Sequence, residues 1–64
     1  NRIKEARAEL DMTKADLADK IGVSRQSINA IEKGKFVPSA VLALKIARLF
    51  KKPVEDIFSL EDQD

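Results

Sequence analysis

Hydrophobic positions along this chain recur at the three- and four-residue spacing of amphipathic helices. The first stretch places Ile3, Ala6 and Leu10 on one stripe, which we expect to be buried. The same spacing predicts further helices, so that five are expected, over about residues 2–10, 13–21, 24–33, 40–50 and 53–58. No stretch shows the sustained alternation of a half-buried strand. The predicted fold class is therefore all-α.

The predicted helix boundaries carry recognisable end signals. Thr13 followed by Asp16 is a capping-box-like start, because the two side chains can satisfy free amides at a helix N-terminus. Ser24 and Ser39 can cap the helices that follow them. The helix ends fall at residues that tolerate a left-handed turn, namely Asp11, Gly22 and Gly34. Pro53 fits the first turn of a short last helix.

The two helices within residues 13–33 form the most informative unit of the sequence. At about 100° per residue, Ile28 and Ile31 share the inner side of the second helix. The opposite arc carries Arg25, Gln26, Asn29, Ala30 and Lys33, and it is free to meet a ligand. The helix over residues 40–50 is apolar almost all round, which indicates a central position or a shared interface.

Composition limits the chain to one small core and excludes several kinds of chemistry. The 64 residues are expected to form a single domain over residues 1–64, and they contain no Cys and no His. Disulfides, histidine acid–base catalysis and a zinc site of the usual ligands are therefore excluded. We expect no enzyme activity, no cofactor, no metal and no membrane partner. A cytoplasmic location is predicted.

The small net charge of +1 conceals two unlike regions. Residues 1–52 carry all 12 basic side chains and six acids, whereas residues 53–64 carry five acids and no base. The body is therefore basic, at +6, and the acidic end includes a predicted tail over residues 59–64. Such asymmetry is a hint of nucleic-acid binding.

Two short helices joined by a glycine turn carry a family resemblance. The pattern Thr13-x-x-x-Leu17-Ala18-x-x-x-Gly22-Val23-Ser24-x-x-x-Ile28-x-x-x-Glu32-x-Gly34 resembles the Cro and phage-repressor (XRE-type) helix-turn-helix family. The likeness extends over about residues 2–58 and includes the loop Lys35-Phe36-Val37-Pro38-Ser39. It implies a compact five-helix, lambda repressor-like DNA-binding domain with its helix-turn-helix at about residues 13–33. It also implies a sequence-specific transcription regulator, a repressor that binds a pseudo-palindromic operator on double-stranded DNA as a homodimer.

The same resemblance assigns expected roles to individual residues. The expected base-reading residues are Arg25 and Gln26, followed by Asn29 and Ala30. Lys33 and Lys35 match positions that touch the DNA backbone, and Lys14 stands where the family commonly has Gln on a phosphate. Thr13 and Ser24 are expected to be caps first and phosphate contacts second.

Three further expectations concern structure and assembly. The resemblance implies a salt bridge between Arg7 and Glu32 that ties the first helix to the third. We expect Phe36, Phe50 and Phe58 to be buried in the core or an interface rather than to stack on bases. The expected dimer interface comprises Phe50, Val54, Ile57, Phe58 and Leu60.

Two other classes of function remain open at this point. An antitoxin-like or adaptor protein could keep this fold and use its apolar carboxy-terminal face to hold a partner protein. The outward arc and the basic body favour DNA over that alternative. An enzyme is disfavoured, because the sequence has no phosphate-binding loop and no histidine beside its serines.

Overall fold

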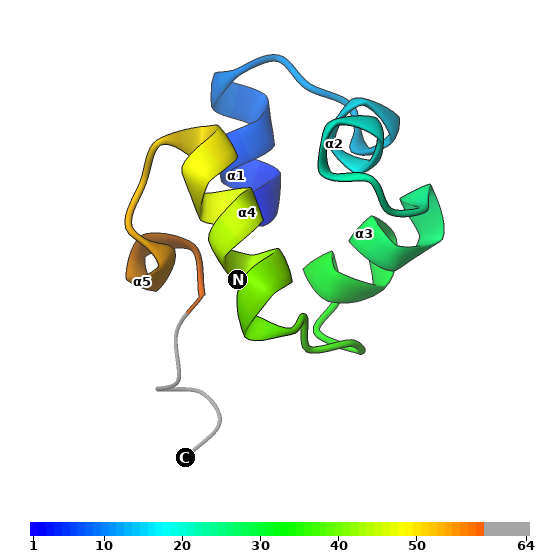
Figure 1. Ribbon diagram of the computed structural model, residues 1–64. Helices are drawn as coiled ribbons and strands as arrows, with labels where there is room; N and C mark the ends of the chain where they lie inside the picture. Colours follow the sequence, from blue (N-terminus) through cyan, green and yellow to red (C-terminus); the bar gives the residue numbers. More distant parts are fainter. Residues whose placement is uncertain (59–64) are drawn as a thin grey trace.

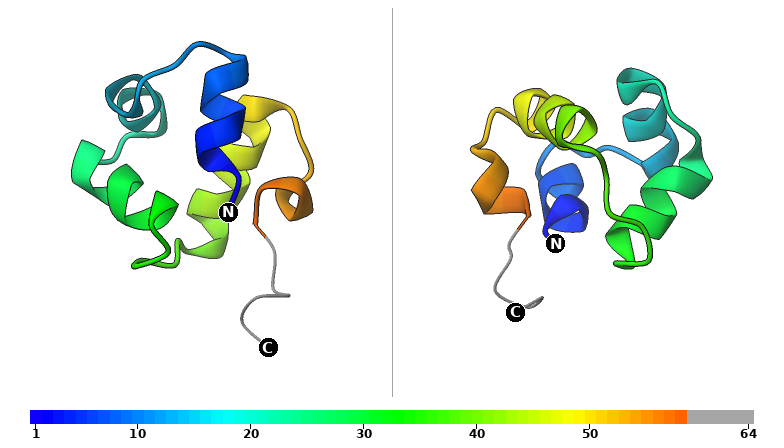
Figure 2. Two further views of the ribbon diagram at one scale, coloured as in Figure 1. Left: turned by 180° about the vertical axis from the view of Figure 1, so that it is seen from behind. Right: turned by 60° about the horizontal axis from the view of Figure 1, so that its bottom comes forward.

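Five helices make up the fold in the computed structural model, which describes residues 1–58. They are α1 (Ile3–Glu9), α2 (Lys14–Ile21), α3 (Arg25–Glu32), α4 (Ala40–Phe50) and α5 (Val54–Ile57). Helices α1 and α4 lie side by side in the middle, with α2 and α3 on one flank and α5 on the other (Figures 1 and 2). The all-α five-helix class predicted from the sequence is confirmed. The predicted tail over residues 59–64 lies outside the described residues.

One small core holds the five helices together, and every helix contributes to it. The largest side chains that are fully buried are Ile3, Leu17, Ile28, Ile31, Ile46 and Ile57. Ala6, Ala18 and Ala47 complete the cluster with Phe50. Burying an aliphatic side chain of this size contributes roughly 1.5–3 kcal/mol. Because each helix adds only one or two such residues, the way the helix ends are fixed has a large influence on their orientation.

Side-chain oxygens fix the N-termini of three helices. Thr13 Oγ1 accepts a hydrogen bond from the amide of Asp16 at 3.0 Å, and Asp16 Oδ2 accepts one from the amide of Thr13 at 3.1 Å. Ser24 caps α3 and Ser39 caps α4 through Oγ, at 3.1 and 3.2 Å. The predicted capping box and both predicted serine caps are therefore present.

The C-termini of the first four helices share one device. Each is followed by a residue with positive φ, namely Asp11 (58°), Gly22 (88°), Gly34 (74°) and Lys51 (58°). The next amide then donates back to the last helical turn, at 2.9–3.1 Å, in the bonds Met12–Arg7, Val23–Ala18, Lys35–Ala30 and Lys52–Ala47. The sequence did not predict Lys51, because lysine has no intrinsic preference for a left-handed conformation.

One expected burial is wrong. Leu10 was placed on the buried stripe of the first helix, but it is 53% exposed. Helix α1 ends at Glu9, and Leu10 is its C-cap at φ −101°, so the turn at Asp11 carries Leu10 off the stripe. Phe36, which we expect to be buried in the core or an interface, is 48% exposed in the loop between α3 and α4, so it is not part of the core; its burial in an interface stays a prediction. Phe50 is buried, as expected.

We predict that the stabilising effect of the capping box depends on pH. The hydrogen bond from the Thr13 amide, supported by the Thr13 side chain, lowers the pKa of Asp16. Because the pKa is lowered in the folded state, the stabilisation is present above the unfolded pKa of about 3.9 and is lost as the pH falls through the folded value. The difference in melting temperature between the parent and Asp16→Ala should therefore be full at pH 6 and small at pH 2.

The matched control for this prediction is Asp19→Ala, which lies on the same helix outside the cap. Comparison of the two variants separates the loss of the cap from the loss of a carboxylate elsewhere on α2. A gap for Asp16→Ala that stayed constant from pH 6 to pH 2 would show that the carboxylate does not stabilise the cap.

Candidate nucleic-acid interface

Helices α2 and α3 contact one another across the turn at Gly22 and present one side of α3 outward. Ile28 and Ile31 are fully buried on the inner side. We call the opposite side the outer face of α3, defined by Arg25, Gln26, Asn29, Ala30 and Lys33. Three of these residues, Arg25, Gln26 and Lys33, are exposed, and the other two are half-buried. The structure thus brings the expected base-reading residues together on one surface.

Basic side chains surround this surface. Arg25 stands at the start of α3, Lys33 and Lys35 follow its end, and Lys14 begins α2 beside it. A shallow hollow of about 260 Å³ is lined by Lys14, Arg25, Gln26 and Asn29. Polar donors around a shallow concave surface suit a ligand rich in negative charge and hydrogen-bond acceptors.

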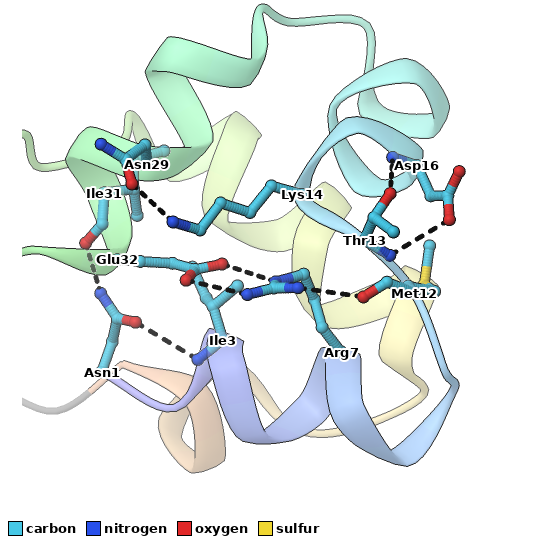
Figure 3. Close-up of polar contacts among 10 residues, drawn as sticks. All are labelled: Asn1, Ile3, Arg7, Met12, Thr13, Lys14, Asp16, Asn29, Ile31 and Glu32. Carbon is cyan, nitrogen blue, oxygen red and sulfur yellow. Dashed lines mark hydrogen bonds and ion pairs between the residues drawn. The ribbon is translucent and has the colours of Figure 1, made fainter.

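A hydrogen bond joins α2 to the outer face of α3. Lys14 Nζ donates to Asn29 Oδ1 at 2.6 Å, and both side chains are half-buried (Figure 3). Lys14 and Asn29 are not linked by any pattern in the sequence. The contact spans 15 positions and depends on how the helices pack, so no local signal could have revealed it.

The end of α3 is tied to α1 by Arg7. Its Nε and Nη2 donate to the two carboxylate oxygens of Glu32, at 2.7 and 3.1 Å. Its Nη1 donates to the carbonyl of Met12 at 3.0 Å, in the connection between α1 and α2 (Figure 3). The side chains of Arg7 and Glu32 are only 12% and 8% exposed. One guanidinium therefore joins three parts of the chain and neutralises the acid nearest to the outer face.

Asn1 makes a second link between the N-terminus and α3, one that the sequence analysis missed. Its Nδ2 donates to the carbonyl of Ile31 at 2.7 Å, and its Oδ1 accepts from the amide of Ile3 at 3.2 Å (Figure 3). An asparagine can satisfy a free amide at a helix start while its nitrogen reaches another helix. The contact with Ile31 spans 30 positions and depends on how α1 packs against α3, so no local signal could have revealed it.

Thr13 and Ser24 are engaged locally as caps, as expected. Both residues are exposed. Ser24 Oγ also lies 3.0 Å from Ser27 Oγ. A phosphate contact from either hydroxyl stays a prediction.

Two residues of the expected dimer interface are buried within a single chain. Phe50 and Ile57 lie in the core of a single chain, so they are not available to a partner. They are buried because α5 packs against α4 and turns these side chains inward. Val54 and Phe58 are half-buried, and Leu60 lies outside the described residues.

An apolar surface nonetheless remains on α4. Val41 and Leu44 are 65% and 57% exposed. They line an open groove of about 500 Å³, which we call the α4–α5 groove, together with Lys45, Ala47, Arg48, Lys52, Pro53 and Val54. The exposed apolar surface predicted for this helix is therefore present, but it is formed by Val41 and Leu44 and not by Phe50.

In residues 1–58, there is no cluster of three or more acidic, His or Cys side chains that could hold a metal ion. None of the helices described there is long and apolar enough to span a membrane.

The arrangement of α2, the Gly22 turn and α3 within a five-helix bundle defines the helix-turn-helix class. A family model described as helix-turn-helix matches residues 3–57, and the chain belongs to that family. Residues 3–57 include all five helices, so the match covers the whole bundle.

Relatives with similar sequences come from archaea and bacteria. An uncharacterized HTH-type transcriptional regulator of Methanocaldococcus jannaschii is 55% identical over 64 residues, which are all of this chain and 97% of the relative. One of Archaeoglobus fulgidus is 49% identical over 98% of this chain and 89% of the relative. The Bacillus subtilis regulator YgzD is 45% identical over all of this chain and 97% of its own length.

We predict that Glu32 stabilises the fold and does not read bases. Glu32→Ala should lower the free energy of unfolding by on the order of 3 kcal/mol, because it leaves the nearly buried Arg7 guanidinium without its charged partner. The control is Glu9→Ala, which removes the exposed pair with Lys52 (3.3 Å) and should cost less than about 1 kcal/mol. Urea denaturation measures both.

If Glu32→Ala melts like the parent yet prefers a different DNA sequence, the residue belongs to the reading surface.

Proposed function

We propose that this protein is a transcription regulator that binds double-stranded DNA sequence-specifically through the outer face of α3. The observation that carries the proposal is the exposure of Arg25 and Gln26 at the start of α3, on the side opposite the buried Ile28 and Ile31. In the helix-turn-helix docking geometry, the N-terminal part of the second helix enters the major groove. The relatives named as transcriptional regulators support the same role.

Each proposed base contact follows from the chemistry of its side chain. Arg25 can donate two hydrogen bonds to guanine O6 and N7, and Gln26 can pair with adenine N6 and N7. Ala30, one turn further along, offers a methyl contact to thymine. Lys33 and Lys35 follow the helix and would bind phosphates, which fixes the register of the protein without reading sequence.

Regulation would result from occupancy of the site. The resemblance to phage repressors favours repression, in which the bound protein blocks transcription from the DNA it covers. Such a protein acts in the cytoplasm, where archaeal and bacterial DNA lies.

A selection experiment tests the proposed function directly. The full chain is incubated with a random duplex library, and the bound duplexes are enriched and sequenced. Recovery of one motif, lost in an Arg25→Ala, Gln26→Ala double variant, supports the proposal. A library that stays unenriched at low salt would contradict it and leave the protein-interaction alternative, for which the exposed apolar α4–α5 groove is the specific observation.

We predict that base-reading and phosphate-binding side chains separate under changes of sequence and salt. Gln26→Ala should remove about 1–3 kcal/mol of discrimination at one base position of each half-site, because a bidentate contact distinguishes base pairs. Lys35→Ala should weaken binding to all duplexes alike and flatten the plot of log affinity against log salt by about 0.9 per protomer, because fewer counterions are released.

Titrations of the selected site and its single-base variants at several salt concentrations measure both effects. A changed base preference in Lys35→Ala, with only a salt effect in Gln26→Ala, would mean that the reading face is misassigned.

The proposed assembly is a two-fold dimer built on the α4–α5 groove. Val41, Leu44 and the half-buried Val54 supply its apolar part. In a two-fold interface, the contacts are reciprocal. Glu55 and Asp56 are exposed acids on α5 of one copy. In the dimer they can face Lys45 and Arg48, which border the groove of the other copy. Such a dimer would present two α3 helices roughly 34–36 Å apart and call for a pseudo-palindromic operator.

We predict that Leu44→Lys weakens this dimer by about tenfold or more, because it replaces an apolar contact with a charge beside Lys45 and Arg48. Leu10→Lys is the matched control, since Leu10 is similarly exposed and does not line the groove. Sedimentation equilibrium measures the dissociation constant of each variant. A monomeric parent at tens of micromolar, both free and with its DNA site, would disprove the dimer.

A further inference from the structure

The bond between Lys14 and Asn29 determines which way the Asn29 amide faces. A lysine ammonium carries three donors and no acceptor, so the atom of Asn29 that it contacts at 2.6 Å must be the carbonyl oxygen Oδ1. The ambiguity between the oxygen and nitrogen of an amide is thereby removed. Figure 3 shows the Asn29 nitrogen pointing away from Lys14. Asn29 therefore presents its Nδ2 donors beyond the contact, on the outer face of α3.

The bond also changes what Asn29 can recognise. A free asparagine pairs with adenine by accepting from N6 and donating to N7. With its oxygen already engaged by a cation, Asn29 offers mainly donors, and the ammonium beside it adds further donors. The major-groove edge of guanine presents two acceptors, O6 and N7, whereas that of adenine presents one acceptor and one donor. A pair that offers mainly donors fits guanine better than adenine.

We infer that Lys14 and Asn29 act as one base-reading unit that selects guanine, with Lys14 as a positioning residue for the Asn29 amide. This inference rests on the proposed function and adds a base position that neither residue would specify alone. Lys14 is then more than a phosphate contact, and its removal changes sequence preference as well as affinity. The two residues belong to different helices but line the same hollow beside Arg25 and Gln26.

Three variants at the two positions test the inference. Lys14→Ala frees the amide, so the preference at one position of each half-site should shift from guanine toward adenine by about tenfold. Asn29→Ala should lose the guanine preference at that same position. Lys14→Gln keeps an N–H donor for Oδ1 but loses the charge, so it should retain guanine while the salt slope falls by about 0.9 per protomer.

Lys35→Ala is the matched control, because it removes one positive charge from the same side of the protein without a contact to Asn29. It should lower affinity and salt dependence with no change of preferred base. The measurement is enrichment of a random duplex library by the full-length parent and each variant, after circular dichroism has established that each is folded. If one variant of Lys14 fails to fold, the other variant and Asn29→Ala still identify the base position.

The possible results separate cleanly. A shift at one shared position in Lys14→Ala and Asn29→Ala, restored in Lys14→Gln, supports the inference. If Lys14→Ala behaves like Lys35→Ala and keeps the parental preference, the bond is only a link between helices and the inference is wrong. A parent that enriches no duplex contradicts the proposed function itself and the inference with it, whereas a parent motif without guanine at the affected position overturns the inference alone.

Discussion

The orientation of α3 depends above all on the contacts of Arg7. The Arg7 guanidinium binds both oxygens of Glu32 at the end of α3 and the carbonyl of Met12 before α2. It is nearly buried, so these bonds form in a medium where unpaired charges are expensive. Any rotation of α3 about its axis would leave this charge or its partner unsatisfied. The contact therefore fixes the angle at which the outer face of α3 meets the solvent.

This constraint matters because the core alone is small. Each helix contributes only one or two large buried side chains, and apolar packing of that size tolerates some repacking. Directional bonds supply the missing precision: the caps at Thr13, Ser24 and Ser39 fix where helices start, and left-handed residues fix where they end. The outer face of α3 is thereby held in one position, which a bidentate base contact needs.

Features that depend on nearby residues could be predicted from the sequence. The capping box of Thr13 and Asp16, the turn at Gly22 and the inward side of α3 at Ile28 and Ile31 all follow from local spacing. Features that depend on distant packing could not. The Lys14–Asn29 bond spans 15 residues, and the contact of Asn1 with Ile31 spans 30.

The difference between local spacing and distant packing also explains why the exposed residues of α4 and α5 were predicted wrongly. The sequence showed that α4 is apolar almost all round. Which of its apolar residues stay exposed depends on the side of α4 against which α5 packs. The structure buries Phe50 and Ile57 and exposes Val41 and Leu44. The pair of Arg7 and Glu32 was expected only from the family resemblance, since no local pattern links residues 25 positions apart.

NMR titration of the ¹⁵N-labelled chain with its selected duplex tests whether the outer face of α3 binds DNA. The largest changes in chemical shift are expected at the backbone amides of Arg25, Gln26 and Asn29 and at the N-terminus of α2, with little change along α4. This is the result expected if α3 enters the major groove. Changes concentrated at Val41, Leu44 and Val54, with the amides of α3 unmoved, would contradict that placement of α3.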